Sequence, residues 1–62
     1  MKEINAIIVD DELNSIHNLA TAIQEYAKSI TVIGTSQTIV EGVKLWGEHK
    51  PDVIFLEIEM HG

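Results

Sequence analysis

Carboxylates follow two apolar runs in this chain, one near the start and one near the end. The first run, AIIVDDE, stops at Asp10 and Asp11, and the second, PDVIFLEIEM, leads to Glu57 and Glu59. Several carboxylates in one crevice cannot all stay ionised comfortably without a cation. Magnesium prefers hard oxygen ligands, is typically held by one or two carboxylates, and keeps positions open for water or a phosphoryl group. The pattern predicts a magnesium site if the two runs lie side by side.

Three strands are predicted from the distribution of apolar residues. Residues 4–9 and 53–58 are almost continuously apolar, which is typical of parallel strands buried on both faces. Residues 30–35 form a short β-branched segment, which indicates a further strand between them in the sequence.

Two amphipathic helices are predicted to connect these strands. The first starts at Leu13, and its apolar residues recur every three or four positions on one face: Leu13, Ile16, Ala20, Ile23 and Ala27. The second follows Thr38, whose spacing from Glu41 is that of a capping box, and ends before Pro51. Gly42 and Gly47 weaken this helix. We interpret its Trp46 as a cover for the sheet in preference to a binding anchor.

The β-α-β-α-β order predicts an α/β fold with right-handed crossovers in a three-stranded parallel sheet. With the first strand in the centre (strand order 2-1-3), the helices lie on opposite faces, as in half of a flavodoxin-like doubly wound fold. The carboxyl ends of the first and third strands then form the switch point. Because adjacent strands are about 4.8 Å apart, Asp10, Asp11 and Glu57 are expected to converge there.

Length and charge exclude several classes of protein. Sixty-two residues make one small domain of marginal stability. The net charge of −6 argues against direct binding to nucleic acid or to an anionic membrane. The chain has no cysteine for disulfides or thiolate metal sites, and no apolar run near the roughly 20 residues that span a bilayer. Its start does not have the pattern of a signal peptide, so a cytoplasmic location is expected.

The two acidic motifs and the spacing of the elements resemble bacterial response-regulator receiver domains, most closely those attached to LytTR-type DNA-binding domains. The resemblance extends through the whole chain. It implies a two-component signal transduction module of the phosphorelay type, in which Asp10 and Asp11 bind magnesium. Glu57 would stand at the position that accepts a phosphoryl group from a sensor histidine kinase, and the backbone carbonyl of Glu59 would be a further metal ligand.

Two features depart from this resemblance. Glu57 stands where these receivers have aspartate, and the extra methylene moves the carboxylate outward by roughly 1.5 Å. Since in-line transfer is sensitive to displacements on that scale, phosphorylation is expected to be impaired. The chain also ends at Gly62, directly after the third predicted strand. Residues 1–62 are therefore expected to form a truncated receiver domain, without the switch hydroxyl and the lysine of the family.

The third strand would be an edge of the sheet in this order, although its residues are suited to burial on both faces. We therefore expect a homodimer in which this strand pairs antiparallel with its copy. The alternative function is a structural, self-associating half-domain whose acidic cluster is inert. An independent metal-dependent phosphotransfer enzyme is disfavoured, because the sequence offers no general acid-base pair and no lysine near the acids.

Overall fold

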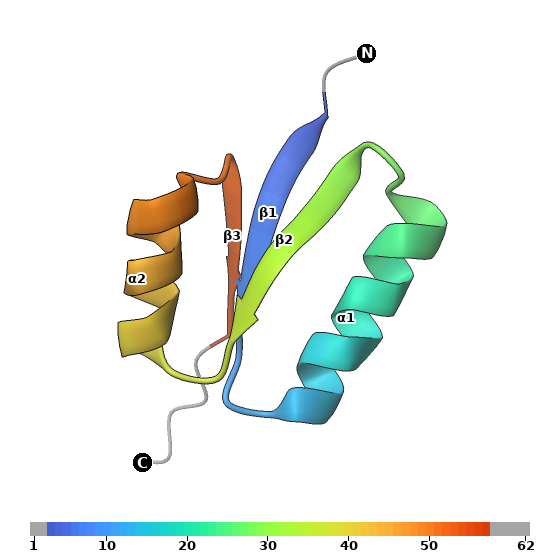
Figure 1. The fold of residues 1–62 in the computed structure, drawn as a ribbon. Coiled ribbons are helices and arrows are strands. Elements are labelled where there is room, and N and C mark those ends of the chain that lie inside the picture. The colour runs from blue at the N-terminus through green and yellow to red at the C-terminus, as the bar shows by residue number, and fades with distance from the viewer. Residues whose placement is uncertain (1–2, 58–62) are drawn as a thin grey trace.

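Three parallel strands and two helices make up residues 3–57, the part of the chain that the computed structural model describes. The sheet has the order β2-β1-β3 (Figure 1). This confirms the predicted α/β fold, half of a flavodoxin-like doubly wound sheet. The elements, in chain order, are β1 (Ile4–Val9), α1 (Leu13–Tyr26), β2 (Ile30–Ser36), α2 (Ile39–His49) and β3 (Val53–Leu56).

The two helices cover opposite faces of the sheet, so that β1 is enclosed from both sides (Figure 1). On the α1 face, Ile8 packs with Ile16 and Ile23 in the hydrophobic core. On the α2 face, Val9 lies against the helix at Gly42. Ile7 and Ile8 are fully buried. The unbroken apolar run in the sequence therefore reflects a central strand with no solvent-facing side in its second half.

Helix α2 approaches the sheet closely at one glycine. A Cβ atom added to Gly42 would lie 2.6 Å from Val9 Cγ2, which is too short for any real contact, whereas one added to Gly47 would meet nothing within 4 Å. Gly42 is thus needed for packing, although the sequence alone presents it only as a residue that weakens the helix.

Two apolar side chains are more exposed than the sequence predicts. Leu13 is 62% exposed, so the buried stripe of α1 begins at Ile16. Trp46 is 52% exposed and covers the sheet only in part. Trp46 lines a groove with Ile54 and Leu56 of β3. The third strand ends at Leu56 in the structure, and Ile58, which we predicted as its last residue, lies outside the described residues.

Strand β2 is irregular at one position. Val32 is the partner of Ala6 and Gly34 is the partner of Ile7, so Ile33 has no partner on β1 and forms a bulge. Strand β3 pairs with β1 without a register shift. Within the described residues, β2 and β3 form the two edges of the sheet, one bulged and the other regular.

Candidate functional site

The acidic residues at the ends of β1 and β3 surround one small pocket. Its cavity has a volume of about 30 Å³, and it is lined by Asp10, Asp11, Glu12, Ser15 and Glu57. The strand order thus brings together the three acids that we predicted to converge. Glu59, the predicted source of a backbone carbonyl ligand, lies outside the described residues.

Backbone hydrogen bonds hold this pocket in place, because the sheet ladder continues past the strand ends. The Asp10 N–H donates to the Ser36 carbonyl at 3.0 Å. The Glu57 N–H donates to the Val9 carbonyl, also at 3.0 Å. The main chain of both acids is therefore fixed by the neighbouring strand, and only their side chains are free to adjust.

The three acids have different surroundings. Asp10 is only 5% exposed, and its Oδ1 accepts a hydrogen bond from the Glu12 N–H at 2.9 Å. Glu12 is the N-cap residue of α1 but makes no side-chain capping bond, so Asp10 satisfies an amide at the start of this helix. Asp11 and Glu57 are exposed and can turn towards a ligand. One carboxylate is therefore built into the fold and two are adjustable.

The pocket matches magnesium in the type of its ligands more than in their arrangement. Carboxylate oxygens suit this ion, and a cavity of about 30 Å³ has room for one water-sized species. However, no group of three or more His, Cys, Asp or Glu side chains among residues 3–57 is arranged so that it could hold a metal ion.

A serine that the sequence analysis missed fixes the loop beside the pocket. Ser36 is buried at the end of β2, and its Oγ donates to the Thr38 carbonyl at 2.6 Å and accepts from the Thr38 N–H at 3.1 Å. Thr38 Oγ1 in turn accepts from the Glu41 N–H at 3.2 Å. The predicted capping spacing is thus real, but Ser36 takes the amide that Glu41 would satisfy in a full capping box. The sequence signal for this role of Ser36 was its position two residues before the N-cap residue Thr38.

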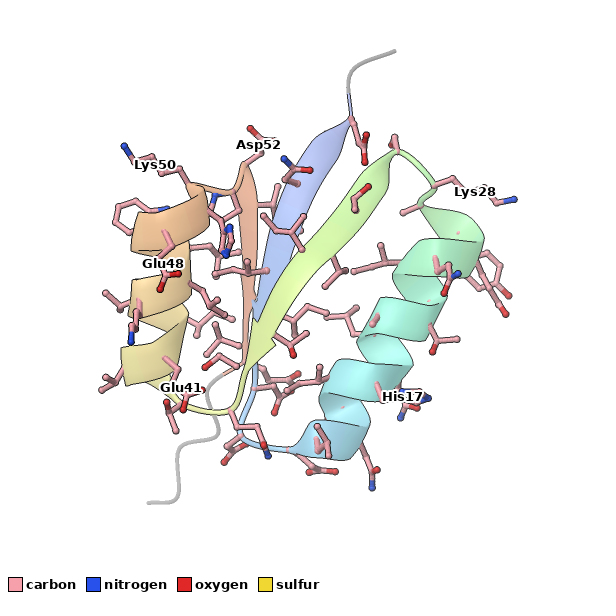
Figure 2. The ribbon with its side chains drawn as sticks, in the orientation of Figure 1. His17, Lys28, Glu41, Glu48, Lys50 and Asp52 are labelled. Carbon is pink, nitrogen blue, oxygen red and sulfur yellow. The ribbon has the colours of Figure 1, made fainter. Side chains whose placement is uncertain are left out.

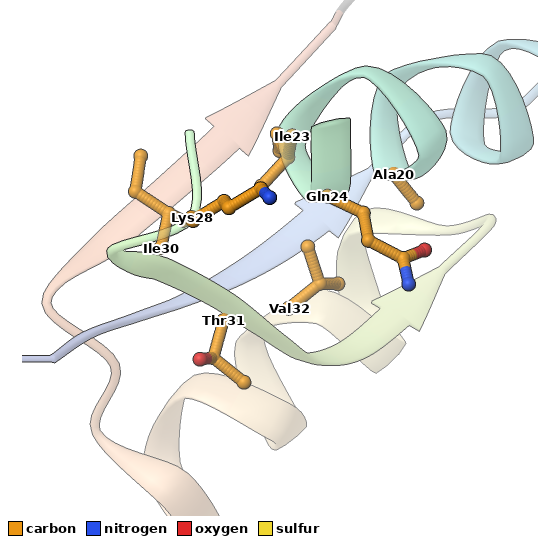
Figure 3. A pocket seen from close by; sticks show the side chains of 7 residues that line it. All are labelled: Ala20, Ile23, Gln24, Lys28, Ile30, Thr31 and Val32. Carbon is orange, nitrogen blue, oxygen red and sulfur yellow. The ribbon is translucent and has the colours of Figure 1, made fainter. Parts of the chain in front are cut away.

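Two of the lysines, Lys28 and Lys50, lie away from this pocket (Figure 2). Figure 2 shows Lys28 and Lys50 near the amino ends of the strands, at the opposite end of the sheet from the acids. A larger hollow, about 530 Å³, lies elsewhere, between the end of α1 and the edge strand β2 (Figure 3). Lys28 and Gln24 are its polar side chains from the α1 side, and it contains no cluster of titratable groups. The acidic pocket is therefore the candidate site.

No helix among residues 3–57 is long and apolar enough to cross a membrane.

The known proteins that are similar to this chain are named as response regulatory or transcriptional regulatory proteins. No family model and no solved structure matches the chain. A response regulatory protein of Vibrio cholerae is 39% identical over 57 residues, which cover 92% of this chain and 24% of that protein. The transcriptional regulatory protein BtsR of Escherichia coli K12 is also 39% identical, over 92% of this chain and 23% of its own length. A response regulatory protein of Shewanella oneidensis is 35% identical over the same share of this chain and 24% of its own. The chain thus spans about a quarter of the length of the curated relatives that it matches.

Proposed function

We propose that this chain forms part of the receiver domain of a two-component response regulator. The observation that carries this proposal is the single pocket that joins Asp10, Asp11 and Glu57 at the carboxyl ends of β1 and β3. The relatives, which are named as response regulatory or transcriptional regulatory proteins, support the same class. In this role the chain is a signalling module and not an enzyme in its own right.

Asp10 and Asp11 would hold a magnesium ion, together with the backbone carbonyl of Glu59. When bound, the ion would neutralise the oxygens of an incoming phosphoryl group. Glu57 stands at the position of the nucleophilic carboxylate. The hydrogen bond from the Glu57 N–H to the Val9 carbonyl fixes its main chain. The backbone therefore cannot shift to compensate for the extra methylene, which displaces the carboxylate outward. Glu57 is therefore a degenerate phosphoacceptor.

The partners follow from this proposal. A sensor histidine kinase would be the phosphoryl donor, in the cytoplasm, and an output domain of the LytTR type would be the parent protein's DNA-binding part. This chain itself is unsuited to direct contact with nucleic acid, because its sequence carries ten acidic residues against four lysines.

A magnesium titration followed by the amide NMR signals of the chain tests the proposal. Millimolar magnesium is expected to shift the signals of Asp10, Asp11 and Glu57 and to raise the melting temperature by mass action. Asp11→Asn should weaken this response. Asp52→Asn removes an equal charge beyond the other end of β3 and serves as the matched control. Unchanged spectra and melting temperature, or equal effects of the two variants, would contradict a metal site among these acids.

A structural, self-associating role is the second candidate. The observation that favours it is the exposure of Ile54 (43%) and Leu56 (53%) on the edge strand β3. A homodimer through this edge is compatible with the receiver role, and the two proposals can be tested separately.

A further inference from the structure

Two polar residues are buried among residues 3–57, and they lie at the ends of neighbouring strands. Ser36, the last residue of β2, is 3% exposed, and Asp10, directly after β1, is 5% exposed. The Asp10 N–H donates to the Ser36 carbonyl at 3.0 Å. Serine and aspartate are mostly exposed in folded proteins, so a buried pair of them that is joined by a hydrogen bond needs a reason other than packing.

The Ser36 hydroxyl closes the turn that carries this carbonyl. Its Oγ donates to the Thr38 carbonyl at 2.6 Å and accepts from the Thr38 N–H at 3.1 Å. Serine commonly bonds to the backbone two residues further on in this way. Rotation of the peptide unit between Ser36 and Gln37 would strain both bonds, and the same rotation would turn the Ser36 carbonyl away from Asp10. The hydroxyl therefore holds the carbonyl in the orientation that Asp10 requires.

Asp10 connects this turn to the start of α1. Its N–H is bound by Ser36, and its Oδ1 accepts from the Glu12 N–H at 2.9 Å. On the other side of the turn, Thr38 Oγ1 accepts from the Glu41 N–H at 3.2 Å, in the first turn of α2. Hydrogen bonds thus run from the start of α2 through Asp10 to the start of α1. All of them lie among residues 10–41, so β3 does not contribute to them.

We infer that Ser36 is a positioning residue of the acidic pocket and acts on Asp10 through its own carbonyl. Alanine at position 36 would fit the same space but would supply neither bond to Thr38. The consequence for a bound cation rests on the proposed receiver function, in which Asp10 presents its carboxylate to magnesium. Groups that orient a metal ligand from behind typically change the metal affinity by about 10–100-fold when they are removed.

Hydrogen exchange without added metal tests the positioning of Asp10. The quantity to measure is the exchange rate of the Asp10 amide divided by that of Ile8, in the middle of β1, because the ratio cancels changes in global stability. Ser36→Ala should raise this ratio by about 2–10-fold, the factor that corresponds to one lost hydrogen bond. Thr38→Ala is the matched control. It removes the cap on the Glu41 N–H but keeps both bonds of Ser36, which go to the main chain, so the ratio should stay unchanged.

An unchanged ratio in Ser36→Ala, or an equal rise in the two variants, would overturn the inference. Equal rises would mean that any loss of order at the start of α2 loosens Asp10, and that the Ser36 hydroxyl has no particular part in holding it.

A magnesium titration then tests the consequence for the pocket. The amide NMR signals of Asp11 and Glu57 in the folded chain report binding. Ser36→Ala should raise the dissociation constant for magnesium by about tenfold, the lower end of the range for groups behind a metal ligand, and Thr38→Ala should leave it unchanged. Equal affinities of Ser36→Ala and the unaltered chain would contradict a positioning role. If the unaltered chain does not respond to magnesium, the proposed metal site fails, and the exchange ratio still decides the role of Ser36.

Discussion

Replacing Gly42 and Gly47 separately by alanine should move the stability of the chain in opposite directions. Both glycines lie in α2 and neither has a positive φ, so alanine is allowed by the backbone at both positions. Within a helix, alanine is more favourable than glycine by about 1 kcal/mol. At Gly47 nothing lies within 4 Å of the new methyl group, so we expect a gain of about 0.5–1 kcal/mol in the free energy of unfolding.

At Gly42 the new methyl group would overlap Val9. Its carbon would lie 2.6 Å from Val9 Cγ2 and 3.3 Å from Val9 Cγ1, and Val9 is buried with a stiff, β-branched side chain. Overpacking of this kind typically costs about 1–3 kcal/mol, which exceeds the helix gain. We therefore expect Gly42→Ala to lose about 1 kcal/mol net. The two variants should differ by about 2 kcal/mol, or roughly 8–16 °C in melting temperature for a domain of this size.

Urea unfolding followed by far-UV circular dichroism measures this difference, at one protein concentration for all variants because self-association would add to stability. If Gly42→Ala proves as stable as Gly47→Ala, the close approach of α2 to β1 does not exist as described. A double-mutant cycle locates the effect. In a Val9→Ala background, Gly42→Ala should cost less or become stabilising, because the overlapping methyl groups are gone.

Three further outcomes are expected. Incubated with a small phosphodonor and magnesium, the chain should form no stable phosphoryl adduct, because in the proposed receiver role the extra methylene of Glu57 would misplace the nucleophilic carboxylate. A stable adduct on Glu57 in the mass spectrum would disprove this reason. Thr38→Ala should lower the free energy of unfolding by about 1 kcal/mol because its Oγ1 caps α2, whereas Glu12→Ala, at an N-cap with no side-chain bond, should change it much less. Lys50→Gly should raise the melting temperature, because Lys50 has a left-handed backbone (φ 46°) that glycine adopts without the cost of about 1–2 kcal/mol; an unchanged or lower value would show that this conformation is not strained.

The fold could be predicted from the sequence because its signals are strong and local. Continuous apolar runs indicate parallel strands at β1 and β3, although Ile54 and Leu56 of β3 are exposed within the described residues. With β1 in the centre, the right-handed crossover rule then places the two helices on opposite faces. The convergence of Asp10 and Glu57 follows directly from that order. These predictions depended on patterns over several residues, not on the contacts of any one side chain.

The individual contacts could not be predicted in the same way. Whether Leu13 and Trp46 are buried depends on which surface lies opposite them, and periodicity gives only the face of the helix. The role of Gly42 depends on the distance between α2 and β1, for which a glycine in a sequence is an ambiguous signal. Ser36 was missed because the sequence does not distinguish a buried serine with local hydrogen bonds from an ordinary loop serine.

The central position of β1 has a consequence for how the chain opens. Both edge strands depend on β1 for their pairing, and Ala6 to Val9 are buried between the two helices. No local fluctuation can expose these amides without separating the sheet, so their hydrogen exchange should report the global free energy of unfolding. Within residues 3–57 no strand pairs with the outer edge of β3, and the amides of Ile54 and Leu56 alternate with the Glu57 amide that bonds to β1, so they should exchange without opening of the sheet. One hydrogen-exchange experiment on this chain should therefore include both unprotected amides and amides that exchange only on global unfolding. The exchange rates of the β1 amides should give the free energy of unfolding of the whole fold without denaturant.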